Sequence, residues 1–247
     1  MTDQTGPDAA FAAVLHLAHR EGLGAYRTSF LPKRAHVVRL IGLFVMGLLG
    51  LIVVVGLYFI VMAFMTPNLN GRQRARRLHF FEGGLVLADA KGPTVWYRWN
   101  AVSCLQSITR RYANGVYVGT TYVYTMIAPD GKQTKVTNFF DRPEEWGPLI
   151  QQEITRAQVP AALATLHAGA SVAFGPLTIN RGGMATNNRS ITWGEVQELQ
   201  IVQGYLRVKK AGGWMRWSAK PVSAIPNFFV FLTAADTLRT GWRSLAN

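Results

Sequence analysis

The sequence predicts an α+β protein in which one transmembrane helix precedes two small antiparallel β-barrels or sandwiches, each closed by a C-terminal helix. Two observations predict this organisation. One long apolar run without charges lies near the N-terminus, and the rest of the chain repeats a pattern of short strands and a helix. The predicted parts are a tail over residues 1–39, a transmembrane helix over 40–65, and domains over 72–165 and 166–247.

The N-terminal tail contains a short amphipathic helix. It is expected from about Asp8 to Arg20, where Gly22 and Gly24 follow and end it. Four apolar residues in it have the i, i+3, i+4, i+7 spacing of one helix face: Phe11, Val14, Leu15 and Ala18. We expect this face to lie either on a membrane or against the folded part of the chain.

The apolar run extends from Leu40 to Met65, 26 residues without a charge. A helix of that length would be about 39 Å long at about 1.5 Å per residue, which exceeds the roughly 30 Å of bilayer hydrocarbon. The run therefore predicts an integral, single-pass protein of the cell membrane. Two alternatives are a buried core helix and a re-entrant hairpin that bends near Gly50.

Basic residues follow the apolar run, in a chain whose net charge is +13. Anionic lipid headgroups attract such a segment by about 1 kcal/mol per charge, so four arginines are candidate headgroup ligands: Arg72, Arg74, Arg76 and Arg77. The alternative is an ordinary basic membrane flank. Charges on the two sides of the run balance, and the basic C-terminal region with its single cysteine, Cys104, favours a cytoplasmic location.

The chain beyond the basic flank contains an internal duplication. Three blocks recur in the same order: Gly-Gly at 83–84 and 182–183, Trp-x-x-Val from Trp99 and Trp193, and Asn-Phe-Phe at 138–140 and 227–229. Each Gly-Gly pair lies between short apolar runs, as in a hairpin, and each Asn-Phe-Phe block opens a helical pattern. Each copy should therefore contain six or seven strands and one closing helix.

With the motif (Tyr/Ile)-x-Trp-x-x-Val at its middle strands, this pattern resembles the bacterial pleckstrin-homology-like (PH-like) domains. The whole chain is similar to a family of uncharacterised actinobacterial membrane proteins that have a short N-terminal helix, one apolar segment and two such domains. The motif residues are structural signatures of such domains and name no activity: Gly83, Gly84, Trp99, Val102, Asn138 and Phe139. In lipid-binding eukaryotic relatives, basic residues in the first hairpin loop hold inositol phosphates, whereas this loop is Glu82-Gly83-Gly84 and contains no base.

The first copy is longer than the second by residues 110–120. Asn-Gly in this segment is a strong signal for a two-residue turn, so the insertion predicts a projecting β-hairpin. Arginine and tyrosine are enriched at binding interfaces. The candidate binding residues of this hairpin are Arg110, Arg111, Tyr112, Asn114 and Tyr117. The alternative is a long hairpin without a function.

The sequence predicts no enzyme, cofactor or metal site. Its five histidines are scattered, and no nucleophile-elbow, phosphate-loop or zinc-protease motif occurs. The expected function is therefore a membrane-anchored, non-enzymatic binding or scaffold protein that acts on a lipid or protein partner at the membrane surface. The alternative is an accessory subunit of a larger membrane complex. A nucleic-acid partner is disfavoured, because no strand has the basic and aromatic pattern of an RNA-recognition module.

Overall fold

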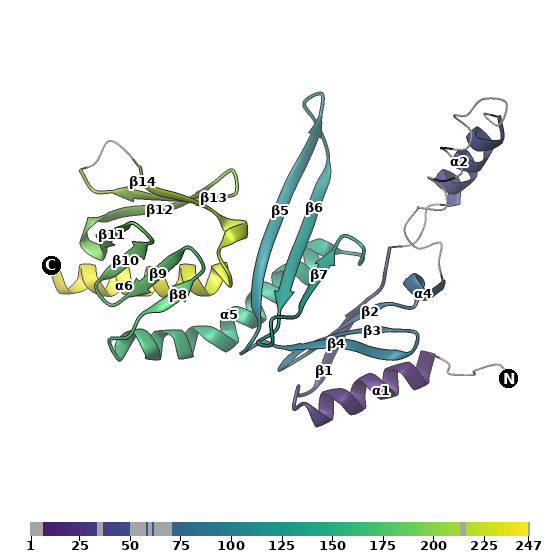
Figure 1. The fold of residues 1–247 in the computed structure, drawn as a ribbon, viewed down its shortest axis with the longest axis horizontal. Helices are drawn as coiled ribbons and strands as arrows, with labels where there is room; N and C mark the ends of the chain where they lie inside the picture. The colour runs from purple at the N-terminus through teal and green to yellow at the C-terminus, as the bar shows by residue number, and fades with distance from the viewer. Residues whose placement is uncertain are drawn as a thin grey trace. The chain divides into compact units, whose positions relative to one another are not determined.

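The computed structural model describes residues 7–33, 37–49, 58, 61, 71–212 and 216–246. Figure 1 shows the order of the elements along the chain. The chain divides into two units, of which unit 1 contains Met1–Trp96 and Asn138–Arg142, and unit 2 contains Tyr97–Thr137 and Pro143–Asn247.

Unit 1 is built on an antiparallel sheet with the strand order β1-β2-β3-β4. Its strands are β1 (Tyr26–Phe30), β2 (Arg77–Phe81), β3 (Gly84–Asp89) and β4 (Gly92–Arg98). Its helices within the described residues include α1 (Pro7–Arg20), α2 (Val37–Leu49) and α4 (Gly71–Arg74). Strand β1 comes from the segment predicted to be a tail, and Phe30 pairs with Leu78 of β2. The tail therefore supplies an edge strand of this sheet.

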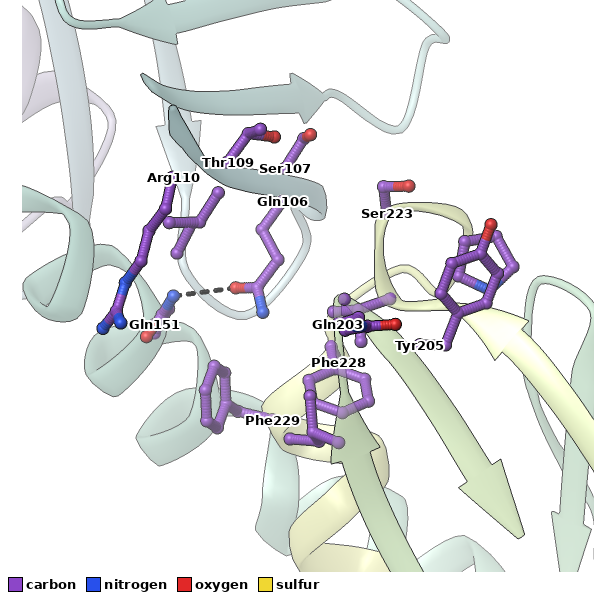
Figure 2. A pocket seen from close by; sticks show the side chains of 15 residues that line it. Gln106, Ser107, Thr109, Arg110, Gln151, Gln203, Tyr205, Ser223, Phe228 and Phe229 are labelled. Atoms are coloured by element: carbon purple, nitrogen blue, oxygen red, sulfur yellow. Dashed lines mark hydrogen bonds between the residues drawn. The ribbon is translucent and has the colours of Figure 1, made fainter. Parts of the chain in front are cut away.

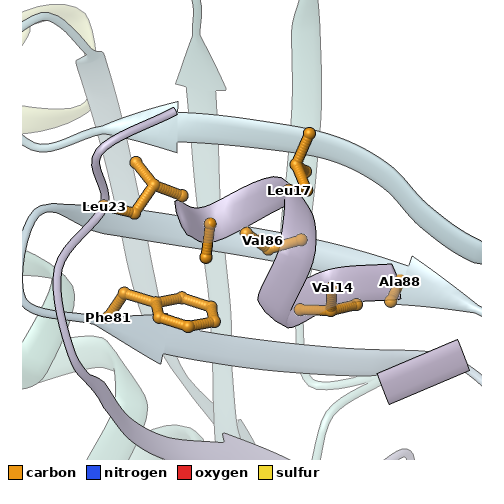
Figure 3. Close-up of a cluster of buried hydrophobic side chains, with 7 residues drawn as sticks. Val14, Leu17, Leu23, Phe81, Val86 and Ala88 are labelled. Atoms are coloured by element: carbon orange, nitrogen blue, oxygen red, sulfur yellow. The ribbon is translucent and has the colours of Figure 1, made fainter. Parts of the chain in front are cut away.

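Helix α1 packs its apolar face on the same sheet, which decides between the two expectations for that face. A buried cluster joins Val14, Leu17 and Ala18 of α1 to Phe81, Val86 and Ala88 of the sheet, together with Leu23 (Figure 3). Leu15, expected on the inner face, is 40% exposed. An isolated helix of 14 residues is only marginally stable, and burial of these side chains against the sheet supplies the missing stability.

The described residues of unit 2 form three antiparallel sheets and two long helices. The first sheet consists of β5 (Ser103–Ala113), β6 (Val116–Ile127) and β7 (Gln133–Thr137), and α5 (Pro143–His167) follows. Trp146 of α5 packs its ring edge-on against Tyr124 of β6, with centroids 5.5 Å apart. The second sheet consists of β8 (Val172–Phe174), β9 (Leu177–Asn180), β10 (Gly183–Thr186) and β11 (Arg189–Thr192).

The third sheet of unit 2 is formed by β12 (Val196–Val202), β13 (Tyr205–Lys210) and β14 (Arg216–Pro221), and α6 (Phe228–Ala246) follows. Short 3-10 turns, η1 (Trp193–Glu195) and η2 (Val222–Ala224), precede β12 and α6. The element order of β1 to α5 is repeated from β8 to α6: a four-stranded sheet, a three-stranded sheet and a helix. The two series are called the first and second repeat below.

The prediction of a transmembrane helix is wrong. Among the residues that the structure describes, no helix is long and apolar enough to cross a membrane. The described part of helix α2, Val37–Leu49, has 13 residues, which corresponds to about 20 Å and is shorter than a bilayer's hydrocarbon. Apart from Tyr58 and Val61, the remainder of the run lies outside the described residues. The predictions of an integral single-span protein and a cell-membrane location depended on this helix and are wrong with it.

The buried-core alternative does not fit α2 either, because Phe44, Met46 and Leu48 are 44%, 55% and 71% exposed. The place of the run in the fold also differs from the expectation. Since β1 and β2 are neighbours in one sheet, the run lies in the connection between two paired strands. In the second repeat only Gly175 and Pro176 separate β8 from β9.

Candidate binding cleft beside strand β5

The predicted hairpin insertion is present as the outer part of the β5–β6 hairpin, called the arm below (Figure 1). Asn114 and Gly115 form its turn with φ values of 48° and 78°, the two positive values that a type I′ turn requires. Strands β5 and β6 have 11 and 12 residues, whereas β12 and β13 have 7 and 6. The insertion therefore lengthens a hairpin that both repeats contain.

The tip of the arm exposes apolar side chains. Tyr112 and Tyr117 face each other across the hairpin with ring centroids 5.9 Å apart, and they are 60% and 55% exposed. The Tyr117 hydroxyl forms a 2.8 Å hydrogen bond with the Thr120 hydroxyl, which fixes the tyrosine ring. Val116 and Val118 are also more than half exposed. The tip thus presents a small, ordered apolar surface.

The structure separates the predicted arm residues into three places. Tyr112 and Tyr117 lie at the tip, and Asn114 has a backbone role in the turn. Arg110 lines a cavity at the base of the arm. The adjacent Arg111 faces the other side of β5, because successive strand residues point to opposite faces.

The cavity at the base of the arm has a volume of about 940 Å³ and lies within unit 2. We call it the cleft (Figure 2). One wall is strand β5 from Gln106 to Arg110, with Gln151 of α5 beside it. The other wall belongs to the second repeat and includes Tyr205 of β13 and Phe228 and Phe229 of α6.

Strand β5 is an edge strand, since its sheet has the order β5-β6-β7. The first position of its outer edge is occupied. The Asn227 amide donates to the Cys104 carbonyl at 2.9 Å, and the Cys104 amide donates to Asn227 Oδ1 at 2.7 Å. In an antiparallel ladder, outward-facing N–H and C=O groups recur at every second residue. The next outward groups therefore belong to Gln106, Ile108 and Arg110, all of which line the cleft.

Asn227, which precedes α6 in the second repeat, forms hydrogen bonds with residues of the first repeat. Its Nδ2 donates to the Val102 carbonyl at 3.0 Å and to Gln158 Oε1 at 2.7 Å. Gln158 Nε2 in turn donates to the carbonyls of Val102 and Trp99. The Asn227 side chain therefore bonds to β5 and α5, while its backbone carbonyl accepts from the first turn of α6.

The walls of the cleft provide hydrogen-bonding groups and apolar surface. Gln151 Nε2 donates to Gln106 Oε1 at 2.8 Å (Figure 2). It also donates to the Tyr124 hydroxyl at 2.7 Å, so both amides are held in place. Burial raises the pKa of the Tyr124 hydroxyl, which therefore stays protonated at neutral pH. Burial also raises the pKa of the Cys104 thiol to about 12. Neither group is suited to act as a nucleophile or base there.

The four arginines of the basic flank have different structural environments. Arg72 and Arg74 belong to α4, and the Arg72 side chain lies outside the described residues. The Arg76 guanidinium lies over the Phe139 ring, 5.7 Å from its centroid. Arg77 Nη1 donates to the carbonyls of Arg74 and Arg76 at 2.6 and 2.9 Å. Two of the four predicted headgroup ligands are therefore held by local contacts within unit 1.

Sequence reasoning missed Gln106, Gln151, Gln158, Phe228 and the interaction made by Asn227. The signal available for Asn227 was its recurrence at the start of Asn-Phe-Phe in both copies. No local pattern indicates Gln106 and Gln151, which are brought to the cleft from a strand and a helix far apart in the sequence.

One family model matches residues 16–241, from α1 to α6, and its description is "Family of unknown function (DUF6585)". The chain belongs to the DUF6585 family. No curated protein and no solved structure matches this DUF6585 chain. The matched region includes the strands of both repeats, the arm and the cleft, so all of these features lie within the part of the chain that the family model covers. The DUF6585 description names no activity, ligand or location.

Proposed function

We propose that this DUF6585 protein is a non-enzymatic binding protein of two tandem PH-like domains that holds a partner protein in the cleft beside β5. The observation that carries this proposal is the outer edge of β5, whose groups from Gln106 to Arg110 border the cavity. The order of elements in each repeat, four strands, three strands and a helix, supports the PH-like interpretation.

The side chains of the cleft favour binding over catalysis. Among the described residues that line it, Arg110 carries the only formal charge, and the other polar groups are amides and hydroxyls. General acid–base catalysis uses a group whose pKa lies near the working pH, beside the reacting atoms. Amides, hydroxyls and aromatic rings instead provide orientation and apolar contact for a ligand.

A protein partner fits the surroundings of the cleft. Tyr112, Tyr117 and two valines are exposed on the arm, whose base forms one wall of the cleft. Tyrosine and arginine are enriched in interface hot spots, where an apolar centre is surrounded by polar groups. The arm tip and the cleft together offer this composition along the β5–β6 hairpin.

Site-specific photocrosslinking in cells of the native host tests the proposal. A benzophenone amino acid is placed at Thr109 in the cleft, at Tyr112 on the arm, or at Lys135 as a control. Lys135 is exposed on β7, the opposite edge strand of the same sheet. We expect Thr109 and Tyr112 to yield the same discrete protein adduct and Lys135 to yield none. The absence of a discrete adduct, or the same adduct from Lys135, would overturn the proposal.

A further inference from the structure

We infer that the occupant of the cleft is an extended, acidic polypeptide segment that pairs with the outer edge of β5 as an additional strand. A carboxylate of this segment lies at Arg110, and an apolar side chain lies against the phenylalanines of α6. The inference rests on the proposed binding function and adds the chemistry of the partner.

The backbone of β5 supplies the first argument. The N–H and C=O groups of Gln106, Ile108 and Arg110 point outward, and in the described part of the chain no strand pairs with this edge. These three residues span about 14 Å, so a segment of about five residues could pair with all of them. A strand edge that borders a cavity and pairs with no strand is a template for β-strand addition, in which main-chain hydrogen bonds supply affinity.

The chain itself supplies the second argument, because it already uses this edge once. Asn227 fills the outward position at Cys104, with its backbone N–H and its side-chain Oδ1 acting as the donor and acceptor of a paired strand residue. Beyond Asn227 the chain turns away into α6, which begins at Phe228. The ladder position that follows Cys104 is that of Gln106, and there the edge borders the cavity.

Side chains along the cleft indicate which residue types the partner segment should carry. Arg110 forms no ion pair among the described residues, no acidic side chain lines the cleft, and the chain has a net charge of +13. A carboxylate is therefore the complementary group at this end. At the other end, Gln106 lies near Phe228 and Phe229. Because Gln106 and Arg110 are four residues apart, the acidic and apolar residues of the partner should also be four apart.

The experiment uses a random twelve-residue peptide display library, selected on the purified full-length protein. Binding of the selected peptides is measured by fluorescence anisotropy. We expect Asp or Glu four positions from an apolar residue. Methylation of alternate backbone nitrogens of the peptide should weaken binding about tenfold each, because each loses one main-chain hydrogen bond, and methylation of the nitrogens between them should have little effect.

Charge reversal at Arg110 tests the proposed contact, and the same change at the adjacent Arg111 is the matched control. Arg110→Glu should weaken binding more than tenfold and should accept a peptide whose acidic residue is replaced by lysine. Arg111→Glu, on the opposite face of β5, should change binding less than threefold. Circular dichroism and the Tm establish that both variants fold. The inference is overturned if no peptide is selected, if N-methylation shows no alternation, or if the two arginine variants behave alike. A cleft-specific crosslinked protein would still support the proposed function in each of those cases.

Discussion

Asn227 and Cys104 pair with each other as neighbouring strand residues do, although they belong to different repeats. Two hydrogen bonds of 2.9 and 2.7 Å join them, and Asn227 adopts a left-handed conformation with φ of 48°. Asparagine tolerates this conformation better than most residues. One residue therefore fastens the start of α6 to the edge of β5 and leaves the rest of that edge beside the cleft.

Asn227→Ala should lower the free energy of unfolding by about 3 kcal/mol. The substitution removes the acceptor of Cys104 and the donor to Val102 and Gln158, at about 1 kcal/mol each, and alanine is disfavoured at positive φ. Asn227→Gly loses the same side-chain hydrogen bonds but tolerates the positive φ, so it should be less destabilising than alanine. Urea denaturation measures both values, and a loss below about 0.5 kcal/mol for alanine would contradict this role.

Gly182 and Gly183 are adjacent but should respond differently to alanine. A Cβ at Gly183 would overlap the Ile191 carbonyl oxygen and lie 2.9 Å from Thr192 Cα, both of them backbone atoms. A Cβ at Gly182 would meet only Asn180 Oδ1, at 3.5 Å. Gly183→Ala should therefore cost about 2–3 kcal/mol of stability, and Gly182→Ala less than about 1 kcal/mol. Equal Tm values for the two variants would show that the β10–β11 pair is not as close as described.

The Cys104 thiol should not react in the native protein. It is buried, and burial raises its pKa to about 12, so almost no thiolate exists at pH 8. A disulfide reagent should modify it only after denaturation with guanidinium chloride. Ser107→Cys, which places a thiol at an exposed position of the same strand, should react without denaturant. Fast modification of Cys104 under native conditions would mean that the start of β5 opens readily.

His79 should make the protein less stable in mild acid. Its ring is buried among Phe11 and Tyr26, and burial, reinforced by the charge of Arg77, lowers its pKa to about 4. Since the unfolded chain has a pKa of about 6.5 here, the unfolded state binds more protons between these values. Stability is therefore complete above pH 6.5 and falls by about 3 kcal/mol as the pH approaches 4.

His79→Leu removes the titrating group and should flatten this part of the stability profile. Denaturant unfolding from pH 4 to 7 compares the two proteins, and the difference between their slopes reports His79 alone. A wild-type profile that has the same slope as that of the variant would refute the assignment.

Local signals in the sequence predict the repeated elements well. Asn114-Gly115 specifies a type I′ turn without help from the rest of the chain. The repeated motifs also lie at matching places, with Gly84 and Gly183 at the start of a strand and Trp99 and Trp193 directly after one. The prediction of a transmembrane helix is wrong because hydropathy reports only the composition and length of the apolar run, whereas the run lies in the connection between the paired strands β1 and β2. Strand β1 was missed because Tyr26–Phe30 is short and its partner β2 lies far along the chain.

The cleft could not be predicted from the sequence for a related reason. Gln106, Gln151 and Phe228 come from β5, α5 and α6, and only the packing of one repeat beside the other brings them together. Each of these residues has an ordinary role within its own element, so no periodicity marks it. The arginine and tyrosines of the arm were detectable because they lie within a single insertion.

Strand β1 and helix α1 precede the apolar run in the sequence but complete the sheet that follows it. A shortened protein beginning at residue 71, the natural choice for removing an apolar segment before expression, would lack both. Phe81, Val86 and Ala88 would then face water beside an uncovered edge of β2, a combination that promotes aggregation. Replacing the segment between Phe30 and Arg77 with a short polar linker would retain both elements and is the better route to material for crystallisation.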